Sequence, residues 1–335
     1  MSPKGGEIRQ NKEYRIHEQT DEMRTSLNQK NFLLTIDVED WFQVENLRSW
    51  NPPHTWEKRE LRVEQNIFRI LDLFDEMSLQ SRGNGTTKSR LKAYSKEDES
   101  GDLKATFFIL GWIAERLPHL VREIQNRGHE VASHGYNHEL CTSMTPEELH
   151  GDLVRSRSLL EDISGKQVRG YRAPNFSINV NVFHILEKSG YTYDSSFNSF
   201  ALNGRYGRVD LSQKKTRGIA FEITTNLSEL PVSNPNFLGK VFPFSGGGYF
   251  RLMPLRFFMF GVKKILEQEN AYVFYLHPWE IDPEQPYVKV KPRSSRFKHY
   301  VNLHKTEDKM IKFLQMFRSC TFLTCSEYIE KMNSN

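Results

Sequence analysis

Cysteine is scarce in this chain, since only Cys141, Cys320 and Cys325 occur among 335 residues. An odd, widely spaced set without a CxxC pair argues against a disulfide framework and is typical of a reducing compartment. Long apolar runs are also missing, because the most apolar window, 255–266, contains three basic residues. We therefore predict no membrane-spanning helix. The polar first thirty residues lack the apolar core of a signal peptide, so we expect a cytoplasmic location.

Two further absences exclude classes of ligand. No GxGxxG motif follows a predicted strand, which argues against a dinucleotide-binding fold. The net charge is only +4, and Lys and Arg are distributed over the whole chain, so we predict no nucleic-acid partner. The sequence leaves the oligomeric state open.

The chain reads as one α/β domain, 31–333, after a polar tail at 1–30 that we predict to be disordered. Short apolar runs alternate with segments of helical periodicity, which predicts parallel β–α units. The expected strands are 32–38, 105–110, 130–133, 168–172, 191–194 and 271–276, and the expected helices include 113–127, 146–163, 180–188, 254–267 and 305–318. A barrel and an open doubly wound sheet both fit this alternation. Residues 79–102, rich in Ser, Gly, Lys and Glu, interrupt it and are predicted to be a mobile insertion.

A pair of histidines, His134 and His138, stands in the polar stretch Ser133–Glu139. On a helical turn, residues four apart share one face, so two imidazoles could bind one divalent cation together with a third ligand. With 11 histidines in the chain, chance alone supplies roughly a third of one such pair. Two partly exposed histidines on a polar turn are therefore the simpler alternative unless other residues complete the site.

Three carboxylates, Asp37, Glu39 and Asp40, lie where the first predicted strand ends. Side chains alternate along a strand, so Asp37 and Glu39 point to the same side. At the carboxyl end of a parallel strand, such a cluster suits a catalytic base and a metal ligand. A solvated acidic turn is the alternative.

Arg172 and His277 also fall at the ends of predicted strands. An arginine there can hold a carboxylate by a charge-assisted hydrogen bond and lower its pKa, although a loop salt bridge would look the same. A histidine at the mouth of a sheet suits a general acid, or is simply a hydrogen-bonded loop residue. Four features thus lie at carboxyl ends of predicted strands: the acidic cluster, the histidine pair, Arg172 and His277. We therefore expect these side chains to meet at one end of the sheet.

In chain order these motifs resemble those of the polysaccharide deacetylases with NodB homology, carbohydrate esterase family 4. The resemblance covers about residues 31–330 and rests on Thr35-Ile36-Asp37-Val38-Glu39-Asp40, the stretch with both histidines, Arg172-Ala173-Pro174 and Leu276-His277. The subgroup associated with exopolysaccharide export is more similar, through Asp37–Phe42, Pro243–Arg251 and His277–Glu280. That subgroup implies a C-terminal extension from about residue 240.

The resemblance implies a distorted (β/α)7 TIM-like barrel and a bound divalent metal, usually zinc. It implies hydrolysis of N-acetyl groups from amino sugars of a poly- or oligosaccharide, in extracellular polysaccharide biosynthesis. His134 and His138 would bind the metal.

Four other roles are carried over from the family in the same way. Asp37 would be the base, Arg172 its partner and His277 the acid. The backbone N–H of Asn175 would help to hold the oxyanion.

One position departs from the family pattern. Val38 stands where the family has a second Asp as metal ligand, so Glu39 is the natural substitute and Asp40 the other candidate. Glu229 is a candidate for the acidic residue of the fourth motif. Rival functions are hydrolysis of a small amide or cyclic imide, a non-catalytic carbohydrate-binding relic, and a non-haem iron oxygenase with comparable ligands.

Overall fold

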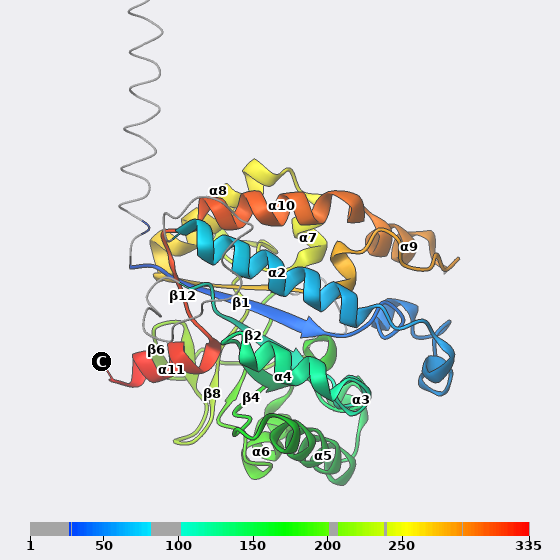
Figure 1. Ribbon diagram of the computed structural model, residues 1–335. Helices are drawn as coiled ribbons and strands as arrows, with labels where there is room; N and C mark the ends of the chain where they lie inside the picture. The colour runs from blue at the N-terminus through cyan, green and yellow to red at the C-terminus, as the bar shows by residue number, and fades with distance from the viewer. Residues whose placement is uncertain are drawn as a thin grey trace, which may run out of the picture.

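The computed structural model describes residues 27, 29–81, 102–200, 207–237, 240–289 and 291–334 (Figure 1). The predicted tail at 1–30 lies almost entirely outside these residues. Most of the predicted insertion at 79–102 lies outside them as well, although helix α2 continues to Ser81.

A curled parallel sheet forms the centre of the molecule. Within the described ranges, seven strands pair in parallel in the order β11-β1-β2-β3-β4-β5-β8. They are β1 (Asn31–Val38), β2 (Ala105–Ile109), β3 (Glu130–Ser133), β4 (Gly170–Tyr171), β5 (Tyr193–Asp194), β8 (Ser228–Glu229) and β11 (Ala271–Leu276). Every residue of β1 is buried, which explains its nearly continuous apolar sequence.

Shorter strands complete the sheet at its margins. β7 (Ala220–Glu222) pairs antiparallel with β8, β6 (Thr216–Arg217) pairs antiparallel with β7, and β12 (Thr321–Phe322) pairs with β1. β9 (Asn236–Phe237) and β10 (Lys240–Val241) form a separate hairpin. Ser233 then links the two ends of the parallel array: its N–H donates to the Val273 carbonyl at 3.4 Å, and its Oγ accepts the Val273 N–H at 2.9 Å. The predicted distorted (β/α)7 barrel fold is confirmed.

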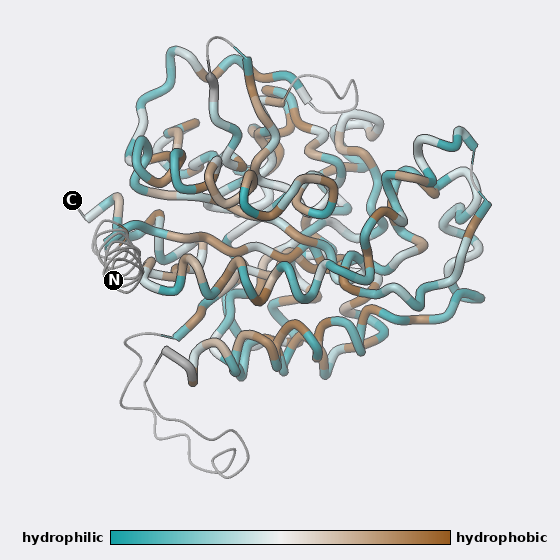
Figure 2. The backbone as a smooth tube through the Cα atoms, turned by 90° about the horizontal axis from the view of Figure 1, so that it is seen from above, coloured by the Kyte–Doolittle hydropathy of each residue, from teal (hydrophilic) through white to brown (hydrophobic). Residues whose placement is uncertain are grey.

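Helices surround the sheet, and their hydrophobic residues recur at intervals along each helix (Figure 2). They are α2 (Val63–Ser81), α3 (Gly111–Arg116), α4 (Pro118–Asn126), α5 (Pro146–Ser164), α6 (Val180–Lys188), α7 (Gly247–Leu252), α8 (Leu255–Glu269), α9 (Arg293–Tyr300), α10 (Leu303–Met316) and α11 (Cys325–Ser334). The 3-10 turns are η1 (Glu45–Leu47), η2 (Pro53–Lys58), η3 (Cys141–Ser143), η4 (Pro174–Phe176) and η5 (Pro278–Ile281). None of the described helices is long and apolar enough to cross a bilayer.

The helix boundaries follow local chemistry. Thr145 caps α5 through a reciprocal pair: its Oγ1 accepts the Glu148 N–H, and the Glu148 carboxylate accepts the Thr145 N–H. The helix expected at 113–127 is divided into α3 and α4, because proline cannot continue a helix from within and instead begins the next one at Pro118. Helices α7 and α9 were not predicted, and only Gly170 and Tyr171 of the strand expected at 168–172 pair as a strand.

Candidate active site

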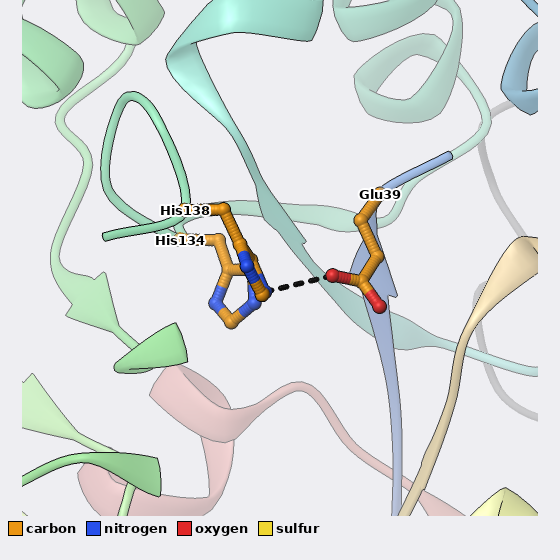
Figure 3. A group of neighbouring side chains, drawn as sticks. All are labelled: Glu39, His134 and His138. Carbon is orange, nitrogen blue, oxygen red and sulfur yellow. Dashed lines mark ion pairs between the residues drawn. The ribbon is translucent and has the colours of Figure 1, made fainter. Parts of the chain in front are cut away.

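Glu39, His134 and His138 form a compact buried cluster beyond the ends of β1 and β3 (Figure 3). One ligand atom from each residue lies within 4.8 Å of the other two. The His138 Nε2 atom is 2.8 Å from the Glu39 Oε2 atom, and the two imidazole rings are 5.3 Å apart. The cluster therefore presents two nitrogen ligands and one carboxylate toward a common point.

The two histidines are not on a helical turn, contrary to the expectation from their spacing. The segment between them is a bent loop, in which Gly135 and His138 adopt positive φ values of 76° and 55°. The Asp152 carboxylate of α5 accepts the Tyr136 N–H at 2.9 Å and holds the loop. A non-glycine residue in the left-handed region, as at His138, is uncommon and concentrates at functional sites.

The protonation and hydrogen bonding of the cluster fit a divalent metal. The His134 Nδ1–H donates to the Arg172 carbonyl at 2.7 Å, which leaves Nε2 with its lone pair for a metal. Burial lowers the pKa of His134 to about 4, so the ring is neutral near pH 7. Among the described residues, His138 Nδ1 is buried without a hydrogen-bond partner, and Glu39 Oε2 faces the other nitrogen of the same ring at 2.8 Å. Two imidazoles and one carboxylate are a donor set typical of zinc.

Glu39 and Asp40 have different environments, which separates the two candidates for the third ligand. The Asp40 carboxylate accepts the N–H groups of Trp41, Arg62 and Val63 at 2.7–2.9 Å, at the start of α2. Burial raises the pKa of Glu39, but His138 and His277 outweigh this effect and lower it to about 2. Glu39 is therefore an ionised member of the cluster, whereas Asp40 anchors the loop to α2.

Asp37 lies beside the cluster and is bound by a fully buried arginine. The Arg172 Nη1 donates to Asp37 Oδ1 and to Thr35 Oγ1, each at 2.7 Å. Its remaining nitrogens donate to the carbonyl and hydroxyl of Ser195, each at 2.8 Å. The guanidinium also lies 4.2 Å from the centre of the Phe108 ring. These contacts fix the direction of the Asp37 carboxylate.

His277 reaches the same point from the end of β11. Its Nε2 is 3.9 Å from Asp37 Oδ2 and 3.5 Å from Glu39 Oε1. On the other side of the ring, Nδ1–H donates to Glu280 Oε1 at 2.6 Å. Burial lowers the pKa of His277, but the carboxylates of Glu39 and Glu280 outweigh burial and raise it to about 9.

Three residues of this arrangement were not predicted: Arg251, Trp279 and Glu280. Arg251 Nε donates to Glu280 Oε2 at 2.8 Å, and both side chains are buried. The Trp279 Nε1–H donates to Glu39 Oε1 at 3.2 Å, and its ring stacks on His277. The segment His-Pro-Trp-Glu itself carries a signal, since Pro at the first and Glu at the third position are typical of the start of a turn, and the Glu280 carboxylate accepts the His277 N–H at 3.4 Å.

Asn175 follows β4 in an unusual backbone conformation. Its φ of 52° is followed by a φ of 55° at Phe176, so two successive non-glycine residues are left-handed. Its side-chain nitrogen is buried and has no hydrogen-bond partner among the described residues. Such strain is consistent with a functional position.

Glu229 is paired with another carboxyl group, Asp194. The two residues lie side by side in β8 and β5, within hydrogen-bonding range, and both are fully buried. Glu229 also accepts the Phe197 N–H, and Asp194 the Ser196 hydroxyl. Burial raises the pKa of Asp194 to about 6 and that of Glu229 well above its ordinary value. The carboxylate partner of His277 is thus Glu280, while we expect Glu229 to share a proton with Asp194.

This pair makes stability depend on pH. The folded protein binds more protons than the unfolded chain from about pH 4 upward, to about pH 6 at Asp194 and beyond it at Glu229, so stability falls as pH rises through that window. Glu229→Gln is expected to remove most of this slope, on the order of 2 kcal/mol in total, and to raise the stability at pH 7. Urea unfolding at a series of pH values from 4 to 7 measures the free energy of unfolding and its slope with pH. Asp162→Asn, on the exposed side of α5, is the control. An unchanged slope in the Glu229 variant would contradict the shared proton.

Two family models match the chain in succession. Residues 73–193 match the polysaccharide deacetylase model, and residues 195–330 match a domain of unknown function, DUF3473. The first match contains His134, His138 and Arg172, while Asp37 and Glu39 precede it. Residues from both matches and from the segment before them therefore meet in one site.

Curated relatives align with only part of this chain. A peptidoglycan deacetylase of Helicobacter pylori is 34% identical over 113 residues, covering 34% of this chain and 39% of the relative. A chitooligosaccharide deacetylase of Azorhizobium caulinodans is 30% identical over 130 residues, covering 38% of this chain and 58% of the relative. A peptidoglycan deacetylase-like protein of Gibberella zeae is 38% identical over 93 residues, covering 28% of each chain. The chain thus spans well under two thirds of these relatives.

Solved structures agree on the fold over nearly the whole chain. A candidate polysaccharide deacetylase from Mycobacterium smegmatis superposes with a TM-score of 0.57 at 18% identity, covering 92% of this chain and 91% of that one. The allantoinase PuuE superposes with a TM-score of 0.54 at 12% identity, covering 92% of each chain. Because these identities are low, the superpositions establish the fold alone.

Proposed function

We propose that this chain, which carries a polysaccharide deacetylase domain, hydrolyses the N-acetyl group of an amino sugar in an oligo- or polysaccharide. The observation that carries the proposal is the meeting of three groups at one point: the Glu39/His134/His138 cluster, the Asp37 carboxylate and the His277 ring. Amide hydrolysis needs activation of water, stabilisation of an oxyanion and protonation of the departing amine, and these groups are suited to those tasks.

Glu39, His134 and His138 would hold a divalent metal, and we propose zinc. Such an ion, when bound, supplies Lewis-acid polarisation of a carbonyl and lowers the pKa of water. Asp37 accepts the proton of the attacking water. The buried Arg172 guanidinium, 2.7 Å from Asp37 Oδ1, holds this carboxylate in place for that role.

His277 donates the proton that the leaving amine needs. Glu280 accepts the Nδ1–H, so the Nε2–H is the proton directed toward Asp37 and the substrate. The backbone N–H of Asn175 is the proposed donor to the oxyanion. Water is consumed, the C–N bond breaks, and acetate and a free amine are released.

We also propose, from the resemblance of the segments around Asp37 and 243–251, that the substrate belongs to extracellular polysaccharide synthesis. The resemblance to the export-associated subgroup supports this finer assignment, and the DUF3473 match spans the second of these segments.

The test is acetate release from N-acetylated chito-oligosaccharides, measured with zinc-loaded protein, with EDTA and after zinc is restored. We expect release that EDTA abolishes and zinc recovers. Oligosaccharide binding without acetate release from the zinc-loaded protein would instead indicate a carbohydrate-binding relic. Turnover of a small cyclic imide but of no oligosaccharide would favour the rival hydrolase.

Glu280→Gln is expected to lower kcat by about 10- to 100-fold with little change in KM or bound metal. The glutamine no longer carries the charge that holds the Nδ1–H and favours protonated His277, while the metal cluster is untouched. Steady-state acetate release, alongside metal analysis, measures the effect. Glu284→Gln, at a neighbouring exposed position, is the matched control and should retain wild-type rates. Equal activity in the two variants would contradict the role of Glu280.

A further inference from the structure

The segment between Glu284 and Glu307 is strongly basic, although Lys and Arg are distributed over the chain as a whole. It contains six Lys or Arg residues and no Asp or Glu. The basic strip is defined here as Lys289, Lys291, Arg293, Arg296 and Lys298. Four of these side chains are exposed and Arg296 is half-buried. In the part of the chain that the structure describes, none of the five forms an ion pair. Their charges are therefore available to a partner.

Exposed aromatic rings accompany this charge. Tyr287 and Phe297 are 59% and 57% exposed. Tyr287 contacts Tyr300 with ring centres 4.8 Å apart, and the Arg296 guanidinium lies 5.9 Å from the Tyr287 ring. Rigid aromatic faces beside cations offer apolar area to the C–H faces of sugars while the cations bind anionic groups.

The strip is tied directly to the candidate active site through Arg251. This buried guanidinium donates to the carbonyls of Lys298, His299 and Val301 at 2.9–3.1 Å. The same guanidinium binds Glu280, which in turn binds His277. The backbone of α9 is thus held only two side chains away from His277.

Ring stacking provides a second connection. The His299 ring stacks on Trp279 at 4.3 Å, and Trp279 stacks on His277 at 5.4 Å. Helix α9 also packs against η1, which follows β1, and Figure 1 shows both at the end of the molecule where β1 terminates. The strip therefore lies at the same end of the molecule as the candidate site.

We infer that the basic strip binds the anionic groups of the substrate, so that the substrate is a polyanionic glycan. This inference rests on the proposed function and specifies its substrate class: N-acetylated sugars interspersed with sugars that carry carboxylate or phosphate. A glycan chain whose acetamide reaches His277 extends past α9, where five unpaired cations attract negative charge. Attachment of the strip to the site favours a substrate over a separate membrane contact.

The experiment compares two fluorescently labelled probes of equal length. One is a hyaluronan oligosaccharide, which alternates N-acetylglucosamine with glucuronate, and the other is a neutral chito-oligosaccharide. Binding is measured with metal-loaded Asp37→Asn protein, in which substrate is retained. We expect tighter binding of the anionic probe, weakened by salt. Lys291→Gln/Arg293→Gln/Lys298→Gln should lower its affinity roughly ten-fold and leave the neutral probe nearly unchanged.

A matched triple variant controls for net charge. Arg122→Gln/Lys166→Gln/Lys188→Gln removes three exposed cations from the surface around α4, α5 and α6 and should bind both probes like the parent protein. Equal affinity for the two probes in the parent protein, or equal losses in the two triple variants, would overturn the inference. Strip-dependent binding to phosphatidylglycerol vesicles without glycan binding would also overturn it. If glycan binding depends on the strip but the wild-type protein releases no acetate, the proposed function is refuted. The inference that the strip binds an anionic glycan would then still stand.

Discussion

Asp37→Asn is expected to lower acetate release by about 10³-fold while the bound metal stays at the wild-type level. The amide has the shape of the carboxylate and can still accept the Arg172 hydrogen bond, but it cannot take a proton from water. Asp37 is not a member of the Glu39/His134/His138 cluster, so metal binding is spared. Acetate release and metal content per protein, measured on the same preparation, give both quantities.

Asp40→Asn provides the control for Asp37→Asn. It makes the same chemical change at a carboxylate only three residues from Asp37. Its hydrogen bonds to Trp41, Arg62 and Val63 predict a loss of thermal stability with metal retained and most of the activity preserved. Full activity in the Asp37 variant would remove Asp37 as the base. Loss of metal in the Asp40 variant would reopen the choice of third ligand in favour of Asp40.

His134→Ala is expected to lose both metal and activity. The imidazole is one of the three proposed ligands, and its Nδ1–H is bound by the Arg172 carbonyl, so alanine leaves an incomplete site. The loss in metal affinity should exceed the roughly 10- to 100-fold typical of changing a residue that only hydrogen-bonds a metal ligand. Titration with zinc against a competing chelator measures it, and excess zinc should restore little acetate release.

The matched control for this variant is His184→Ala, at an exposed position of α6. This variant removes one imidazole outside the Glu39/His134/His138 cluster. It should retain the wild-type zinc affinity and the wild-type rate of acetate release. Wild-type zinc affinity in the His134 variant would exclude the proposed site, whatever the activity.

The sequence predicted the barrel and the meeting of the candidate residues, because both depend on local patterns. Parallel β–α units produce short apolar strands between amphipathic helices, and carboxyl ends of parallel strands meet at one end. Asp37, His134, Arg172 and His277 each lie at the carboxyl end of a predicted strand, and the structure brings them together. The resemblance to a known family added the expected roles, which remain proposals.

The remaining features depend on contacts between distant segments. The loop from Gly135 to His138 takes its shape from Asp152 of α5, so spacing alone suggested a helical turn that does not exist. Glu229 meets Asp194 only because the register of β5 and β8 aligns them. Helix α9 has few apolar residues, and its position is fixed by Arg251, which no local pattern reveals.

The position of β1 in the sheet constrains how the protein folds. Asn31 of β1 is aligned with Ala271 of β11 on one side and also with Thr321 of β12, so the first strand needs partners from the last quarter of the chain. Contacts of such high sequence separation form slowly, because a long loop must close before they contribute stability. On the ribosome, β1 must wait with one edge unpaired until β11 has been synthesised. Asp37 and His277 lie at the ends of these two strands, so catalytic competence is expected among the last properties that a newly made chain acquires.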